Sequence, residues 1–185
     1  MLDPAHLALL ALLVFAAAAL YSMVGHGGAS AYLAAMALFG LAPEVMKPTA
    51  LVLNILVSAI ATVQFARAGR FSWRTFWPFA LAAVPLAFVG GAITLPAPLY
   101  RSIVGAVLVY AALRLWQRAG VAAGGTLRAL PKAAALPIGA GMGFLSGLTG
   151  VGGGIFLSPV LVLARWADVR TTAGVSAAFI LVNSI

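Results

Sequence analysis

The sequence Gly150-Val151-Gly152-Gly153-Gly154 interrupts apolar sequence between the runs 133–149 and 154–164. A looser copy, Gly25-His26-Gly27-Gly28-Ala29, also separates two apolar runs, and its glycines precede those of the first motif by 125 positions. Each copy is followed by a polar elbow and then by another apolar run that contains a hydroxyl residue and an asparagine. A glycine-broken apolar unit that occurs twice is typical of membrane transporters built from repeats.

The composition of the chain indicates a membrane protein. Hydrophobic residues make up 64% of the sequence and charged residues 8%, with a mean hydropathy of +1.12, whereas soluble domains carry about 25% charged residues. The net charge of +8 comes mainly from Lys and Arg in short connections, which favours a role in membrane orientation over nucleic-acid binding. The absence of cysteine excludes disulfides and thiolate metal sites.

The lengths of the apolar runs predict an all-α, multi-span helical bundle. The runs 49–66, 75–95 and 99–116 approach the roughly 20 residues that a helix needs to cross a bilayer. The run 154–164 reaches only about 16 Å, so we expect it to form a re-entrant hairpin with 133–149. Backbone at membrane depth must be covered by protein or line a cavity. The alternative is that the glycines only allow close helix packing.

The positions of the positive charges predict an inverted repeat. The connections 67–74 and 117–132 are rich in Arg and Lys, which places both in the cytoplasm and the N-terminus outside. Within one membrane domain, 1–185, a first repeat, 1–116, and a second repeat, 133–185, then run in opposite directions. The alternative is a plain bundle in which the two glycine motifs are coincidental.

The second repeat is shorter than the first and stops at Ile185 in apolar sequence. We therefore expect a C-terminally truncated chain that lacks about two helices by comparison with the first repeat, because a helix end in hydrocarbon leaves its carbonyl groups unsatisfied. The alternative is a homodimer in which a second copy covers the open face.

The glycine breaks predict a binding site for a small anion. Helix N-termini carry free N–H groups and positive potential, and glycine lets a ligand approach the backbone. Helices that start near Ala29 and Ile155 would point two such ends at a shared site. The apolar runs contain no acidic residue, so we expect neither a metal site nor a cofactor.

Polar residues near the breaks complete the predicted site. His26 is the one titratable group at membrane depth, and it is expected either to donate to the anion and couple proton movement or to bond a nearby carbonyl. Polar groups on the following runs are expected either to bond the substrate or to join helices. The predicted substrate-binding residues are Gly25, His26, Gly27, Gly28, Thr49, Asn54, Gly150, Gly152, Gly153, Gly154, Ser176 and Asn183.

The segment from Gly150 to Pro159 resembles the glycine-rich turn and short helix of the TauE/SafE sulfite exporter family. The looser copy around His26 and the sequence Gly174-Val175-Ser176, with Asn183 downstream, are similar to that family as well. The resemblance implies export of sulfite, sulfonates or related small anions across the bacterial inner membrane, driven by protons. It also implies a longer chain with about eight membrane segments.

Three functions are alternatives to proton-driven export of a small anion. A passive anion channel would use the same pore without a proton gradient, and a non-transporting membrane scaffold would pack its glycine breaks tightly. An enzyme is not expected, because the glycine motifs lack the sequence context of nucleotide-binding loops and no catalytic motif is present.

Overall fold

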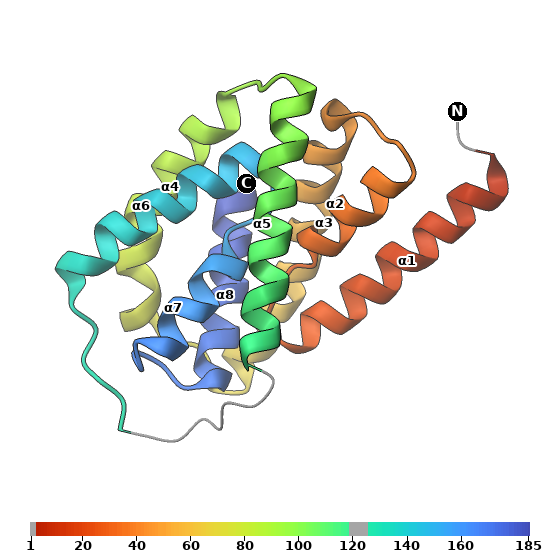
Figure 1. The fold of residues 1–185 in the computed structure, drawn as a ribbon. Helices are drawn as coiled ribbons and strands as arrows, with labels where there is room; N and C mark the ends of the chain where they lie inside the picture. The colour runs from red at the N-terminus through yellow and green to blue at the C-terminus, as the bar shows by residue number, and fades with distance from the viewer. Residues whose placement is uncertain (1–2, 119–125) are drawn as a thin grey trace.

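The computed structural model describes residues 3–118 and 126–185, and its regular structure over these ranges is helical (Figure 1). Part of the predicted cytoplasmic connection 117–132, residues 119–125, lies outside the described residues. The helices are α1 (Pro4–Met23), α2 (Ala29–Leu38), α3 (Pro43–Arg67), α4 (Trp73–Ala92), α5 (Ala97–Arg118), α6 (Lys132–Thr149), α7 (Gly154–Leu163) and α8 (Val169–Ser184).

Short polar side chains cap several helices at their N-termini. Asp3 accepts a hydrogen bond from His6 N–H at the start of α1, and Ser72 accepts one from Thr75 N–H at the start of α4. Asp168 caps α8 and also accepts a hydrogen bond from the Thr171 hydroxyl, which lowers the pKa of the Asp168 carboxyl. These caps satisfy N–H groups that the helices themselves leave unpaired.

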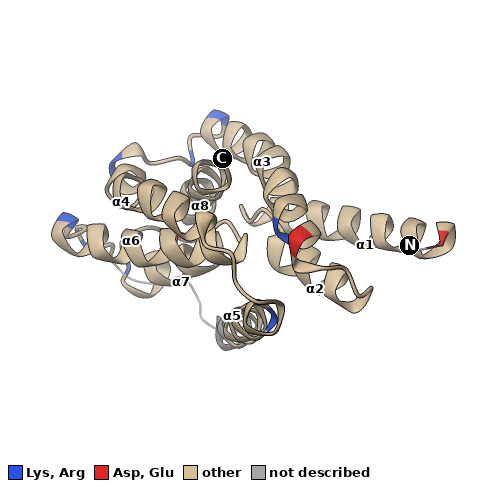
Figure 2. Ribbon diagram, turned by 90° about the horizontal axis from the view of Figure 1, so that it is seen from above, with Lys and Arg blue, Asp and Glu red and all other residues tan. Residues whose placement is uncertain are grey.

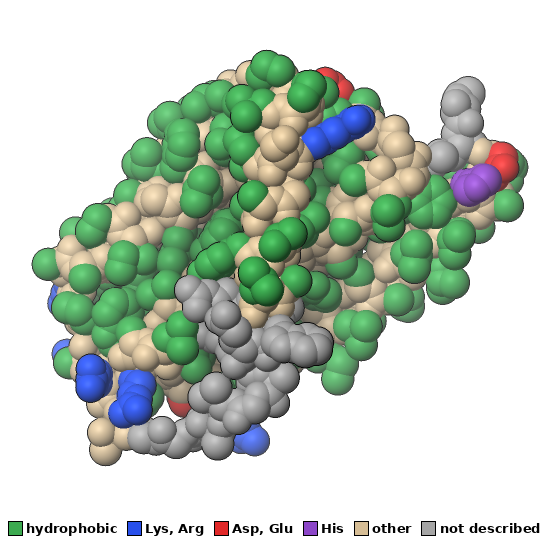
Figure 3. All heavy atoms as spheres, in the orientation of Figure 1, with side chains coloured by type: hydrophobic (Ala, Val, Ile, Leu, Met, Phe, Trp, Pro, Cys, Tyr) green, Lys and Arg blue, Asp and Glu red, His purple; other side chains and the backbone are tan. Residues whose placement is uncertain are grey.

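Within the part of the chain that the structure describes, three helices are long and apolar enough to cross a membrane: α1, α3 and α4. Large apolar side chains such as Phe15, Leu38 and Phe88 are more than two-thirds exposed. Hydrophobic side chains cover most of the face seen in Figure 3. A surface of this kind suits lipid rather than water, so the expectation of an all-helical, multi-pass membrane protein is confirmed.

The centre of the fold is formed by α7 and α8. Eleven residues of α8 and seven of the ten residues of α7 are buried. In contrast, α1 buries only Leu10 and extends away from the other helices (Figure 2). The second short helix and the helix that follows it are therefore enclosed by protein, whereas α1 lies at the periphery.

Glycines spaced four residues apart allow α6 to pack closely on α4. A Cβ on Gly139 would lie 2.5 Å from the Phe79 carbonyl oxygen. A Cβ on Gly143 or Gly147 would clash with the carbonyl oxygen of Ala83 or Ala87, respectively. These α6 glycines thus bring two helix backbones together, as small residues do in membrane proteins.

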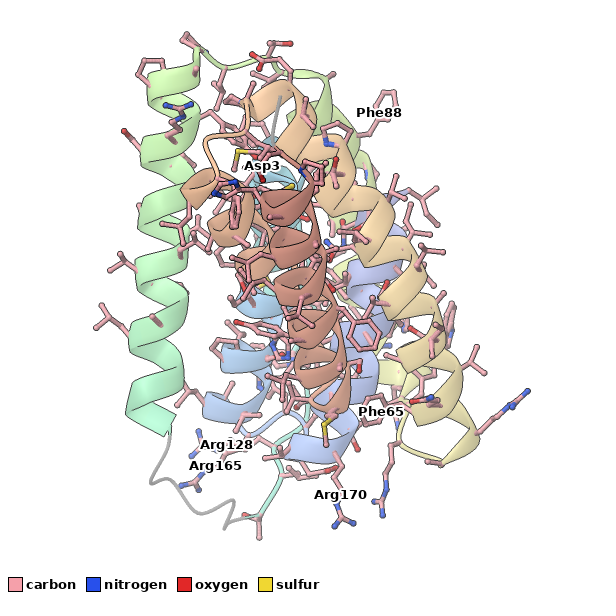
Figure 4. The ribbon with its side chains drawn as sticks, turned by 90° about the vertical axis from the view of Figure 1, so that its right-hand side faces the viewer. Asp3, Phe65, Phe88, Arg128, Arg165 and Arg170 are labelled. Carbon is pink, nitrogen blue, oxygen red and sulfur yellow. The ribbon has the colours of Figure 1, made fainter. Side chains whose placement is uncertain are left out.

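Most of the arginines gather at one end of the molecule. Asp3 and Phe88 lie at one end in Figure 4, and Phe65, Arg128, Arg165 and Arg170 lie at the other. A backbone hydrogen bond of 2.8 Å joins Arg128 N–H to the Arg165 carbonyl. We call this the arginine-rich end, defined by Arg67, Arg70, Arg74, Arg128, Arg165 and Arg170.

The helices alternate in direction between the two ends. Helix α1 runs toward the arginine-rich end and α2 runs back, whereas α6 runs away from this end and α7 returns to it (Figures 1 and 4). The two short helices are ten residues long, or about 15 Å. Each therefore covers about half the thickness of a bilayer core.

The packing of α6 on α4 makes a stability prediction. We expect Gly143→Ala to lower the free energy of unfolding by about 1–3 kcal/mol, because the new methyl group forces two backbones apart. Gly141→Ala is the matched control, since a Cβ at Gly141 meets no atom within 4 Å. Thermal unfolding of the purified protein in detergent measures both variants, and equal midpoints would contradict the packing explanation.

Candidate functional site

The two glycine breaks have left-handed glycines at equivalent first and fourth positions, but they differ at the third, since Gly152 has a φ of 80° and Gly27 is not left-handed. Gly25 and Gly28 have φ angles of 74° and 90°, and Gly150 and Gly153 have φ angles of 77° and 80°. These are left-handed values that residues with a side chain rarely adopt. The short helices α2 and α7 begin directly after the last left-handed glycine of each break. A left-handed glycine thus directly precedes each short helix, at positions 125 residues apart.

Both short helices begin with backbone N–H groups that the helix itself does not use. Tyr32 N–H donates to the Gly28 carbonyl at 3.0 Å, and Leu157 N–H donates to the Gly153 carbonyl at 3.2 Å. Ala31 N–H and Phe156 N–H also donate to these carbonyls, at 3.0 Å each, so the N–H groups that precede them are the ones without a partner within the helix. Because Gly28 and Gly153 are the N-caps, no side chain caps either helix. Each break therefore presents the positive end of a helix.

The two breaks meet at the same pair of side chains. A Cβ on Gly27 would lie 2.5 Å from Asn54 Oδ1, and a Cβ on Gly152 would lie 2.7 Å from Asn54 Nδ2. Ile180 Cγ2 would lie 3.0 and 2.8 Å from the same two Cβ positions. Asn54 on α3 and Ile180 on α8 thus contact both breaks, and glycine is needed at each contact to make room.

Asn54 is buried with its hydrogen-bonding capacity unused. Its side chain is 0% exposed, and neither Oδ1 nor Nδ2 has a hydrogen-bond partner in the described protein. Ser184 Oγ, 3.2 Å from a Cβ on Gly152, is likewise buried without a partner. Unpaired buried polar groups destabilise a protein by about 1–3 kcal/mol each. Asn54 thus places two unpaired polar atoms beside both glycine breaks, and Ser184 places one beside the second.

A hydrogen-bonded chain links the first break to the second half of the protein. His26 Nε2 lies 3.2 Å from Ser158 Oγ on α7, and Ser158 Oγ lies 2.8 Å from Ser176 Oγ on α8. On its other side, His26 Nδ1 lies 3.2 Å from the Val24 carbonyl oxygen. Since a carbonyl only accepts, Nδ1 carries a proton, and in the neutral imidazole Nε2 accepts from Ser158.

The structure places three further predicted glycines in buried contacts, two of which join the two halves. Gly25 packs against the backbone of Ala173 on α8, and a Cβ on Gly150 would lie 3.1 Å from Lys47 Cγ on α3. Gly154 packs against Ile180. All three predicted glycines are buried, so the breaks are closed to solvent in this conformation.

Two of the predicted polar residues lie apart from these contacts. Thr49 is exposed on α3, and its position is rotated by about 140° around the helix from that of Asn54. Asn183 Nδ2 donates to the Phe179 carbonyl at 2.7 Å, while Asn183 Oδ1 is buried without a partner. The structure therefore brings Asn54 and Ser176 to the breaks but does not bring Thr49 there.

Sequence reasoning missed Ser158, Ile180 and Ser184. Ser158 could have been found, because it follows Gly154 by one helical turn and so projects from the same side of α7. Ile180 carries no polar signal, and its role depends on its place opposite Asn54. Within the described residues, no group of three His, Cys, Asp or Glu side chains could hold a metal ion.

Residues 10–185 match the sulfite exporter TauE/SafE family. The chain belongs to this family. It is also 43% identical, over 179 residues, to a protein of Sinorhizobium fredii named "probable membrane transporter protein y4hK", and the alignment covers 95% of this chain and 72% of that relative. No solved structure matches the chain. As a TauE/SafE protein, the chain is a membrane transporter and not an enzyme.

The state of Asn54 predicts an unusual response to mutation. We expect Asn54→Leu, which keeps the side-chain volume, to leave thermal stability unchanged or raised, because it removes two unpaired buried polar atoms. Tyr32→Phe is the comparison, since the buried Tyr32 hydroxyl donates to the Gly27 carbonyl at 2.6 Å. It should cost about 1 kcal/mol. A clear loss of thermal stability in Asn54→Leu would show that Asn54 holds the fold together.

Proposed function

We propose that this protein exports a small sulfur-containing anion, such as sulfite or a sulfonate, across the bacterial inner membrane. The observation that carries the proposal is the buried, unpartnered Asn54 side chain between Gly27 and Gly152. Two uncapped helix N-termini flank these contacts. Together they offer backbone N–H donors and positive potential without a buried charge, as an anion site at a helix N-terminus requires.

The amide of Asn54 suits a partly protonated oxyanion. An amide presents an NH₂ donor and a carbonyl acceptor, while an oxyanion that retains a proton both accepts and donates. In this proposal Nδ2 donates to an oxygen of the anion, and Oδ1 accepts from its hydroxyl. Gly27, Gly28, Gly152 and Gly153 let the anion reach the backbone, because no Cβ occupies the space around Asn54.

An inverted repeat explains the contacts between the two halves. The break of the first half packs on the second half, Gly25 on Ala173, and the break of the second half packs on the first, Gly150 on Lys47. Gly25 and Gly150 are 125 residues apart, and Lys47 and Ala173 are 126 residues apart. Each contact thus has a counterpart in the other half, as a twofold axis that exchanges the two halves requires. The opposite directions of the two hairpins support the same assignment. The proposed repeats are 1–116 and 133–185, within one membrane domain.

The charge distribution supports an orientation in the membrane. Because positive residues favour the cytoplasmic side, we assign the arginine-rich end and the connections 67–74 and 117–132 to the cytoplasm. The N-terminus at Asp3, which lies at the opposite end, is then outside. In this proposal the lipid bilayer, rather than a second copy of the chain, covers the exposed apolar faces.

Filling the second break should stop transport. We expect Gly153→Ala to lower sulfite flux in proteoliposomes at least tenfold, because its methyl group would lie 2.7 Å from Phe179 Cε1 and distort the start of α7. Gly69→Ala is the matched control: Gly69 also has a left-handed φ, of 68°, but a Cβ there meets no atom within 4 Å. Both variants should insert into the membrane.

Equal flux in the two glycine variants would reject the anion site at the break. No flux of sulfite or thiosulfate in the wild-type protein would favour the scaffold alternative.

Proton coupling is assigned to His26. Its imidazole contacts Ser158 and, through it, Ser176, and histidine changes charge near physiological pH. We expect His26→Gln to abolish the stimulation of sulfite flux by an imposed pH gradient while retaining sulfite exchange at equal pH. Ser22→Ala, which removes a hydroxyl bonded to the Ala19 carbonyl in the same region, serves as the control. Wild-type flux that ignores the gradient would instead indicate a passive channel.

A further inference from the structure

A cavity of about 330 Å³ lies where the start of α3 meets the end of α4 and the start of α5. Asn54 does not line it, and the proposed mechanism has not used it. Its polar wall is formed mainly by Glu44, Lys47, Thr94 and Tyr100. Lys47 is the cation of this wall, and it is half-buried.

Lys47 is held at the cavity wall without a neutralising partner. Its Nζ donates one hydrogen bond, to the Gly91 carbonyl at 2.9 Å. Over residues 3–118 and 126–185, no carboxylate lies within ion-pair distance of Lys47. An ammonium group has three donors, so Lys47 retains both a positive charge and donor capacity at the cavity wall.

Leu148 of α6 lines the cavity, and Lys47 on the cavity wall contacts Gly150, the first glycine of the second break. The Lys47 side chain packs against Gly150, with its Cγ 3.1 Å from a Cβ on that glycine. Tyr100, on the same wall, donates its hydroxyl hydrogen to the Thr149 carbonyl at 3.0 Å. An anion in this cavity would therefore lie next to the end of α6. The end of α6 is close in sequence to Gly152, which contacts Asn54.

The packing of the break does not require a lysine. In the other half of the protein, Ala173 occupies the corresponding place and packs against Gly25. The contact at Gly25 is made by the Ala173 backbone and needs no long side chain, so the cationic end of the Lys47 side chain can serve another purpose. The acid on the wall, Glu44, is exposed, so solvent screens its charge more than that of the half-buried Lys47.

We propose that Lys47 forms a second anion site in this cavity, which takes the same class of small oxyanion as the site at the breaks. The anion occupies it on its way between Asn54 and the aqueous phase at the end opposite the arginine-rich end. Lys47 Nζ donates to the anion, and Glu44 weakens the binding so that the anion can leave. This inference rests on the proposed function for its place in transport, and on the cavity and Lys47 for the site.

Chemical protection tests the site without any transport. The chain has two lysines, Lys47 and Lys132, and Lys132 lies over the Trp77 ring, 5.4 Å from its centre, outside the cavity. We expect saturating thiosulfate to slow acylation of Lys47 in the purified protein several-fold, measured by mass spectrometry, and to leave Lys132 unchanged. Chloride at the same ionic strength is the control, and equal acylation of Lys47 in the two salts would overturn the proposal.

Flux measurements test its role in transport. Lys47→Met should raise the KM for sulfite about tenfold, the size expected for a lost charge-assisted hydrogen bond. Arg101→Met is the matched control, because Arg101 is an exposed cation near the same end and does not line the cavity. An unchanged KM in Lys47→Met would also overturn the proposal.

The two measurements separate this proposal from the proposed function. Protection of Lys47 in a protein that carries no sulfite would support the site and reject sulfite transport. Sulfite flux with an unprotected Lys47 would support transport and reject the site.

Discussion

Backbone groups at membrane depth must find hydrogen-bond partners within the protein or a ligand, and the rest of this structure depends on that constraint. In the proposed arrangement the two glycine breaks lie at membrane depth, where lipid offers no hydrogen bonds. Protein covers both: Gly25 packs on α8, Gly150 packs on α3, and α7 is largely buried. The enclosure leaves helix N-termini pointing at a closed interior, where an anion gains most from free N–H groups.

The glycines of this chain serve two different purposes. Those of α6 bring two helix backbones into contact, and replacing them affects the fold. Those of the breaks adopt left-handed conformations and leave room around Asn54. The scaffold is similar in the two halves, but its polar groups are not. His26 and Lys47 have Val151 and Ala173 as counterparts, so coupling and anion capture are assigned to groups that occur once.

The sequence was sufficient to predict the helices and the glycine breaks between them, because these depend on local apolar length and on glycine. The sequence was insufficient where the outcome depends on which face of a helix a residue occupies. The pairing of the asparagines was uncertain in sequence, and the structure places Ile180, not Asn183, opposite Asn54. The offset between the halves is 125 residues at the breaks and 126 at this contact, and one extra residue rotates a side chain by about 100°. Thr49 is exposed because it lies on a different face of α3 from Asn54.

The most direct test of the central claim is to locate a bound anion. Selenite is a heavier analogue of sulfite, and its anomalous scattering would reveal its position in crystals of the full protein. We expect a selenium peak between the two breaks, within hydrogen-bond distance of Asn54 Nδ2 and of a backbone N–H at the start of α2 or α7. Saturating selenite without a peak near Asn54, in crystals of a protein that transports sulfite, would contradict this site.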